Sequence, residues 1–121
     1  MTTAKDLAES LLASYVGGQF KTKSFRDPTR RGEIAEIAVD GRKVHVRLSW
    51  SAVKYGKVWY KDSVSEHTLD LARCQYRMDA WPDAGVLRID CPHLSKAATF
   101  YPKGHRKNID QEDVQLKPKA N

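Results

Sequence analysis

Thiol and imidazole side chains are the first candidates for chemistry in this chain. Cys74, Cys91 and His93 are types of residue that bind zinc, which takes nitrogen and sulfur donors in a tetrahedral arrangement. The hairpin predicted below would place all three on one sheet face. Their spacing matches no familiar zinc pattern, however, and Pro92 should end the strand between them. We therefore predict no metal site and no cofactor, and we interpret Cys74 and Cys91 as reduced thiols in the core.

Catalytic groups are not arranged in any recognisable pattern. Cys91 and His93 are two residues apart in a strand, a spacing at which a thiol and an imidazole seldom hydrogen-bond productively. The acidic residues Asp62, Glu66 and Asp70 are scattered in a way that is typical of surface carboxylates. We therefore expect a binding protein and not an enzyme.

A basic segment with interleaved aromatic rings is the clearest functional signal. The chain of 121 residues has 21 Lys and Arg against 15 Asp and Glu, and residues 41–61 contain six basic residues and no acidic one. Basic groups neutralise phosphates and rings stack on exposed bases, a combination found in single-strand binders. Trp50 has the apolar parity of its predicted strand and is assigned to the core. The predicted partner is nucleic acid, bound with weak sequence preference through Lys43, Arg47, Lys54, Tyr55, Lys57 and Lys61.

Two further basic clusters flank this segment in the sequence. Arg26, Arg30 and Arg31 lie in a predicted exposed loop and should assist, since guanidinium groups bind phosphate in a bidentate manner. Lys21 and Lys23 precede them, and residues 103–107 carry a third cluster. The three clusters would form one continuous track only if the fold brings them to the same side.

The alternative function is a protein-interaction module. The predicted pattern of short strands and turns is similar to that of Tudor-type and related small β-barrel modules, although no family motif accompanies it. That likeness implies an aromatic-lined groove for a peptide or a methylated lysine. An accessory subunit that docks its basic face on an acidic protein is the other form of this alternative.

One amphipathic helix is predicted at the start of the chain. Leu7, Leu11 and Tyr15 recur at helical spacing, so we expect a helix over residues 3–16 that ends at Gly17-Gly18. It should pack across one opening or face of a sheet.

The period changes to two after Glu33, and Asp40-Gly41 predicts a tight hairpin. With these two residues as the turn, Ile37 lies opposite Val44. One face then carries Ala35, Ile37 and Val39 with Val44, Val46 and Leu48, and the other carries Ile34, Glu36 and Ala38 with Lys43, His45 and Arg47.

Residues 82–85, Pro-Asp-Ala-Gly, predict a second hairpin with a four-residue loop. This register places Asp79 opposite Arg88 and Arg77 opposite Asp90, two favourable charge pairs on the outer face.

Shorter strands are predicted over residues 19–24, 57–61, 68–72 and 97–101, and residues 108–116 should form a turn of helix or a closing strand. The fold class is therefore mainly β: a small barrel-like or strongly bent antiparallel sheet of five to seven strands with one N-terminal helix. We expect one domain over residues 1–116, a disordered tail over 117–121, a cytoplasmic location and no membrane association.

Overall fold

The computed structural model describes residues 12–24, 27–70, 75–79, 85–91 and 96–116. These residues form eight strands and two short 3₁₀ helices. In chain order the elements are η1 (Leu12–Tyr15), β1 (Gln19–Ser24), β2 (Arg30–Asp40), β3 (Lys43–Tyr55), β4 (Val58–Lys61), β5 (Glu66–Asp70), β6 (Gln75–Asp79), β7 (Val86–Cys91), β8 (Lys96–Tyr101) and η4 (Gln111–Asp113).

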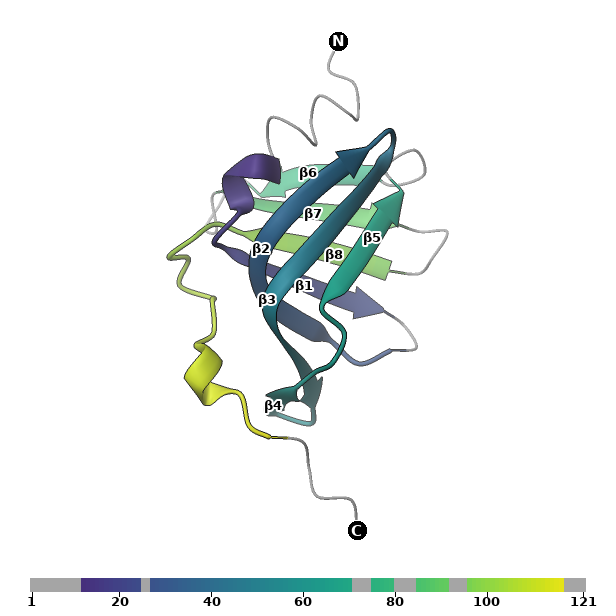
Figure 1. The fold of residues 1–121 in the computed structure, drawn as a ribbon. Coiled ribbons are helices and arrows are strands. Elements are labelled where there is room, and N and C mark those ends of the chain that lie inside the picture. Colours follow the sequence, from purple (N-terminus) through teal and green to yellow (C-terminus); the bar gives the residue numbers. More distant parts are fainter. Residues whose placement is uncertain (1–11, 25–26, 71–74, 80–84, 92–95, 117–121) are drawn as a thin grey trace.

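All eight strands belong to one antiparallel sheet. Its order is β4-β3-β2-β1-β8-β7-β6, and β5 pairs with β3 outside this path. The long strand β3 bonds to β2 on one edge, while on its other edge β5 pairs with its first half and β4 with its second. The sheet bends so strongly that β2, β3 and β5 cross in front of β1, β8, β7 and β6 (Figure 1). The prediction of a mainly β fold is confirmed, but the sheet is open in the part of the chain that the structure describes.

The hydrophobic core lies between these two layers. Its largest fully buried side chains come from both layers: Phe20, Ile34, Val44, Val46, Leu69, Leu87, Ile89 and Phe100, with Leu12 from η1. Phe20 and Phe100 meet edge to face, with ring centroids 4.9 Å apart. Both rings belong to the layer of β1, β8, β7 and β6, and Phe20 also contacts the other layer, since its ring centroid lies 5.1 Å from that of His67 on β5.

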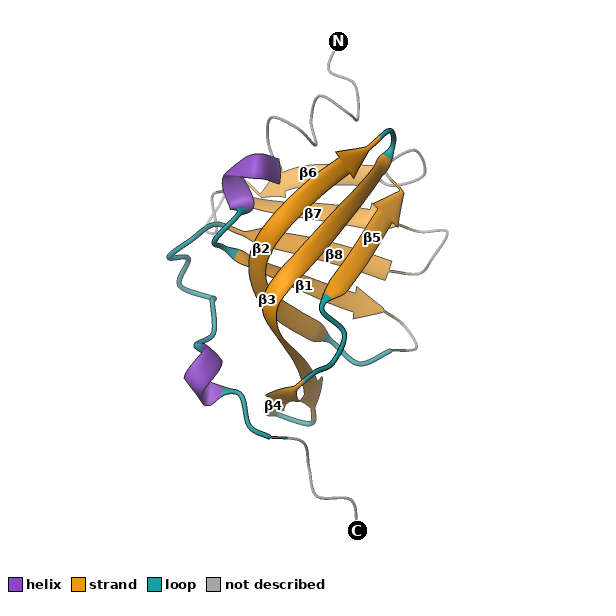
Figure 2. Cartoon of the chain, viewed as in Figure 1, coloured by secondary structure: helices purple, strands orange, loops and turns teal. Residues whose placement is uncertain are grey.

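The short helix η1 lies at one end of the layers (Figure 2). Leu12 and Tyr15 are buried, and the Tyr15 ring packs 5.8 Å from that of Phe100. Gly17 follows with a φ of 91°, which is consistent with a chain that turns out of the helix there. Residues 3–11 of the predicted helix lie outside the described residues.

The first hairpin is present, but its turn is displaced from the predicted one. Asp40 pairs with Lys43, so Gly41 and Arg42 form the loop, and Ile37 lies opposite Val46 instead of Val44. Most side chains still lie on the predicted face of the hairpin, because the observed register differs from the predicted one by an even number of residues. Val44, Val46 and Leu48 are buried and Lys43, His45 and Arg47 are exposed, as predicted.

Irregular pairing near Ala35 reverses two of the predicted orientations. The register shifts between Glu33 and Ile34 and again before Glu36, and this puts Ile34 in the core at 1% exposure and leaves Ala35 exposed. The prediction that Ala35 faces the core and Ile34 the solvent was therefore wrong. Burying isoleucine removes more apolar surface from water than burying alanine, which favours the bulge.

The second hairpin also forms with a different register. Arg77 lies opposite Arg88, and Asp79 opposite Val86, so the two predicted charge pairs are not direct partners. Arg88 instead donates a hydrogen bond from Nε to Oδ1 of Asp90 in its own strand, at 2.9 Å. Leu87 and Ile89 are buried in either register, so the hydrophobic pattern cannot distinguish the two. Residues 80–84 of the predicted loop lie outside the described residues.

The remaining predicted strands correspond to β1, β4, β5 and β8. The segment after β8 contains both of the forms expected for it, since η4 is followed by a parallel bridge between Gln115 and Tyr60. Among the described residues, no helix has the length and apolar character needed to cross a bilayer.

Replacement of Gly41 tests the backbone conformation of the displaced turn. Gly41 has a φ of 62°, a region that β-branched residues resist, although a Cβ there would meet nothing within 4 Å. We expect Gly41→Val to lower the free energy of unfolding by about 1 kcal/mol or more, as measured by urea denaturation. Ala38→Val, at an exposed strand position of the same hairpin, is the control and should cost little. Equal effects of the two substitutions would contradict the conformational explanation.

Candidate functional site

On the outer face of the front layer, which β2, β3 and β5 form, carboxylates surround the cations in the first half of β3. Two outward-facing cations of β3 are flanked by carboxylates from β2 and β5: Lys43 lies between Asp40 and Asp70, and Arg47 lies between Glu36 and Glu66. An oxygen of Glu36 is 2.7 Å from Nη2 of Arg47, and Asp70 pairs with Arg42 at 3.3 Å. Lys43 and Arg47, two of the predicted phosphate contacts, therefore lie on a face that carries its own carboxylates.

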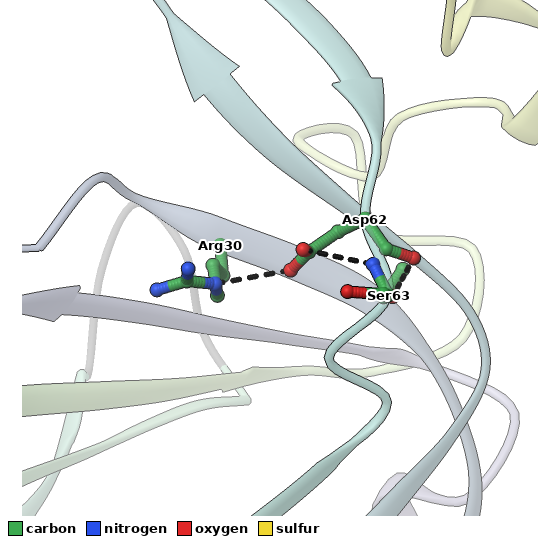
Figure 3. A network of polar contacts seen from close by, with 4 residues as sticks. Arg30, Asp62 and Ser63 are labelled. Atoms are coloured by element: carbon green, nitrogen blue, oxygen red, sulfur yellow. Dashed lines mark hydrogen bonds and ion pairs between the residues drawn. The ribbon is translucent and has the colours of Figure 1, made fainter. Parts of the chain in front are cut away.

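Arg30 forms an ion pair with Asp62 within the protein (Figure 3). Its Nε donates to Oδ2 of Asp62 at 3.0 Å, and the Asp62 side chain is only 9% exposed. Oδ1 of Asp62 accepts from the backbone N–H of Ser63 at 2.9 Å. Arg30 therefore links β2 to the segment after β4. Arg26, predicted as its neighbour at the interface, lies outside the described residues.

Arg31 lies on the opposite side of β2 from Arg30 and is almost fully buried. Its Nε donates to Oε1 of Gln19 at 2.7 Å, and its guanidinium carbon lies 4.6 Å from the ring centroid of Tyr101. Gln19 in turn bonds both the N–H and the C=O of Ile109, which ties the C-terminal segment to the sheet. Nη2 of Arg31 is buried without a hydrogen-bond partner. No carboxylate in the described part of the chain forms an ion pair with this guanidinium.

Basic residues from separate parts of the sequence converge around Lys21. Burial lowers the pKa of Lys21, and the nearby positive charges of Arg31, Lys23, Lys54 and Lys107 lower it further. Among the ion pairs between described residues, none includes Lys21, Lys23 or Lys54. We call these five residues the Lys21 cluster: Lys21, Lys23, Arg31, Lys54 and Lys107. The cluster draws members from all three basic regions of the sequence.

Strand register explains this convergence. Lys21 pairs with Arg31, Arg31 with Ala52, and Ala52 with Lys61, so these residues form one cross-strand row, in which Arg31 and Ala52 are buried. In the other direction the row continues from Lys21 through Thr99 to Arg88. Lys61, another predicted contact, is exposed at the β4 end of this row.

The tip of the β3–β4 hairpin carries the remaining predicted residues. The Lys54 ammonium lies 5.8 Å from the ring centroid of Trp59, its partner across the ladder. Tyr55 is 52% exposed, and its ring centroid is 6.1 Å from that of Tyr60. Lys57 is exposed in the turn. Because neighbouring residues of a strand point to opposite faces, Tyr55 and Lys54 project to different sides.

A second titratable group lies between the two layers. His67 is 8% exposed, and its Nε2 is buried without a hydrogen-bond partner. Burial lowers the pKa of His67 to about 4, and the positive charges of Lys96 and Arg30 act in the same direction, while Asp62 opposes them. The imidazole is therefore neutral at pH 7.

Of the three residues considered and rejected as zinc ligands, Cys74 and His93 lie outside the described residues. Within the described ranges, no group of three His, Cys, Asp or Glu side chains is arranged to hold a metal ion.

Sequence reasoning left Lys21, Lys23 and Lys107 out of the predicted contact set. The signal for the first two was present: they alternate along β1 with the buried residues Phe20 and Thr22, which places both lysines on the outer face. No local pattern could have found Lys107, because its approach to Lys21 depends on the course of the segment after β8.

Comparison of the chain with known protein families, with characterised proteins and with solved structures gives no match. The residues themselves are therefore the basis for a functional proposal.

Proposed function

We propose that the protein is a non-enzymatic module that binds nucleic acid on the outer face of its sheet, centred on the Lys21 cluster. The observation that carries this proposal is the gathering of five cationic side chains around Lys21, whose pKa is lowered first by burial and further by the neighbouring positive charges. Like charges placed together repel one another, and a bound polyanion would relieve that repulsion. On the face that holds Lys43 and Arg47, neighbouring carboxylates already offset the positive charges, so a polyanion would relieve no comparable repulsion there.

Phosphate groups would supply most of the affinity in this proposal. Lys21, Lys23 and Lys54 would each contact a phosphate, and the exposed Lys61 would add a contact at the β4 end of the cross-strand row. Arg31 is too deeply buried to serve as a flexible contact, so its role is to add fixed positive charge beneath the lysines. Contacts of this kind do not read base edges, and we therefore expect weak sequence preference.

Salt dependence and charge reversal test the proposal. If about four phosphates are engaged, the logarithm of the association constant should fall with the logarithm of salt concentration with a slope of about −3 to −4. Lys21→Glu and Lys54→Glu should each weaken binding and flatten this slope. Fluorescence anisotropy with labelled single-stranded and duplex oligonucleotides measures both quantities.

Lys43→Glu is the matched control, because it makes the same change in net charge on the face that already carries Asp40 and Asp70. It should alter affinity much less than Lys21→Glu. Equal losses of affinity in the two variants would mean that only the net charge of the protein matters, and they would contradict the assignment of binding to the Lys21 cluster. Absence of oligonucleotide binding at low salt, together with binding to an acidic polypeptide such as polyglutamate, would favour the alternative of docking on an acidic protein.

A further inference from the structure

A cavity of about 370 Å³ lies beside Lys61. It is located between the part of β3 that pairs with β5 and the part that pairs with β4. It is bounded by β3, by the end of β4 and the segment that joins it to β5, and by η4 and the residues that follow it. The irregular pairing of β2 with β3 is close by, because Glu33 pairs with Trp50 while Ile34 pairs with Leu48, which leaves Ser49 out of the ladder. Bulges of this kind are frequent beside functional sites.

The lining of this cavity combines an aromatic ring with hydrogen-bonding groups. Trp50 is half-buried in its wall, and its indole N–H donates to Oε2 of Glu33 at 3.1 Å, which fixes the ring. Val114 and Leu116 add apolar surface, while hydroxyl and amide groups come from Ser49, Ser63, Ser65, Gln111 and Gln115. An indole that has already used its N–H offers its ring for stacking. The cavity therefore suits a flat ring with polar edges.

The cavity is connected to the Lys21 cluster through Lys61. This lysine is exposed and lines the cavity, and it lies in the same cross-strand row as Lys21, with the buried residues Ala52 and Arg31 between them. Three inter-strand steps of about 4.8 Å separate Lys61 from Lys21, a distance of about 14 Å. A strand that contacts both Lys21 and Lys61 would thus bring a nucleotide to the cavity.

We infer that the cavity beside Trp50 receives one unpaired base of a nucleic-acid strand bound at the Lys21 cluster. This inference rests on the proposed function and deepens it, since it names single-stranded nucleic acid as the preferred class. A base in a duplex is stacked and paired with its neighbours, so only an unpaired base can enter. The phosphates would bind along the cations, and the base would stack on Trp50 within reach of the serine and glutamine side chains.

Replacement of Trp50 provides the test. Trp50→Leu keeps apolar bulk but removes the ring, and it should weaken binding of a 12-nucleotide single strand by roughly tenfold while leaving the corresponding duplex unaffected. Tyr55→Leu is the control, because it removes an exposed ring that projects from the other side of the hairpin. Ser65→Leu, which places bulk in the cavity and leaves the bond between Trp50 and Glu33 intact, should reproduce the selective loss even if Trp50→Leu is poorly folded.

A titration with adenosine tests the cavity without any phosphate. The Trp50 indole N–H resonance, assigned by its absence in Trp50→Leu, should shift on addition of the nucleoside and should not shift in Ser65→Leu. If Lys21→Glu abolishes oligonucleotide binding while both cavity variants bind single strands as the wild type does, the inference is overturned and the proposed function stands. If the wild-type protein binds no oligonucleotide, both are overturned.

Discussion

Acidification from pH 7 to pH 4 should destabilise the fold by about 3 kcal/mol through His67 alone. The pKa of its imidazole is about 4 in the folded protein, against an ordinary value of 6.5. Between these two values the unfolded chain binds more protons than the folded one, so the free energy of unfolding falls as the pH decreases. The stabilisation that His67 contributes as a neutral imidazole is fully present above pH 6.5 and is lost as the pH falls to 4. The difference between the two pKa values corresponds to about 3 kcal/mol in the free energy of unfolding.

Urea denaturation at several pH values measures this effect. In His67→Gln the side chain cannot titrate, so the decline in the free energy of unfolding between pH 6.5 and pH 4 should be much shallower than in the wild type. His45→Gln is the control: His45 is exposed, with Nδ1 3.0 Å from Oγ1 of Thr68, and its replacement should leave the wild-type decline in place. A decline in His67→Gln as steep as that of the wild type would show that other groups cause the acid sensitivity.

The sequence indicated the strands more reliably than the way in which they pair. Alternation identified the buried side chains of β3, because Val44, Val46 and Leu48 face the core in any register that differs by an even number of residues. The same degeneracy explains both errors of register. Leu87 and Ile89 remain buried whether Arg88 lies opposite Asp79 or opposite Arg77, so the choice between the two was decided by contacts that lie elsewhere in the fold.

The candidate site was predictable in composition but not in arrangement. The basic character of residues 41–61 is plain in the sequence, and yet Lys43 and Arg47 lie among carboxylates contributed by β2 and β5. Lys54 comes close to Lys21 instead. Charges that are distant along the chain set the local potential of a folded surface, and strand order decides which charges those are. A prediction made from one segment cannot contain that information.

Phe20→Ala should destabilise the protein more than any substitution on its surface. Phe20 is completely buried on β1 of the back layer, and its ring lies 4.9 Å from that of Phe100 and 5.1 Å from that of His67. Because His67 belongs to β5 of the front layer, Phe20 joins the two layers. Truncation of a buried phenylalanine costs about 3–5 kcal/mol, a large part of the roughly 5–15 kcal/mol that stabilises a typical domain.

The same substitution should change the pH dependence of stability. Removal of the Phe20 ring leaves space beside the imidazole that water can enter, and solvation of His67 would raise its pKa toward the ordinary value. Phe20→Ala should therefore combine a lower free energy of unfolding at pH 7 with a smaller further loss between pH 6.5 and pH 4. Phe20→Leu retains most of the apolar volume, so it should cost less and preserve the pH dependence. If Phe20→Ala kept the full wild-type pH dependence, the depressed pKa of His67 would have to arise from Lys96 and Arg30 and not from burial against this ring.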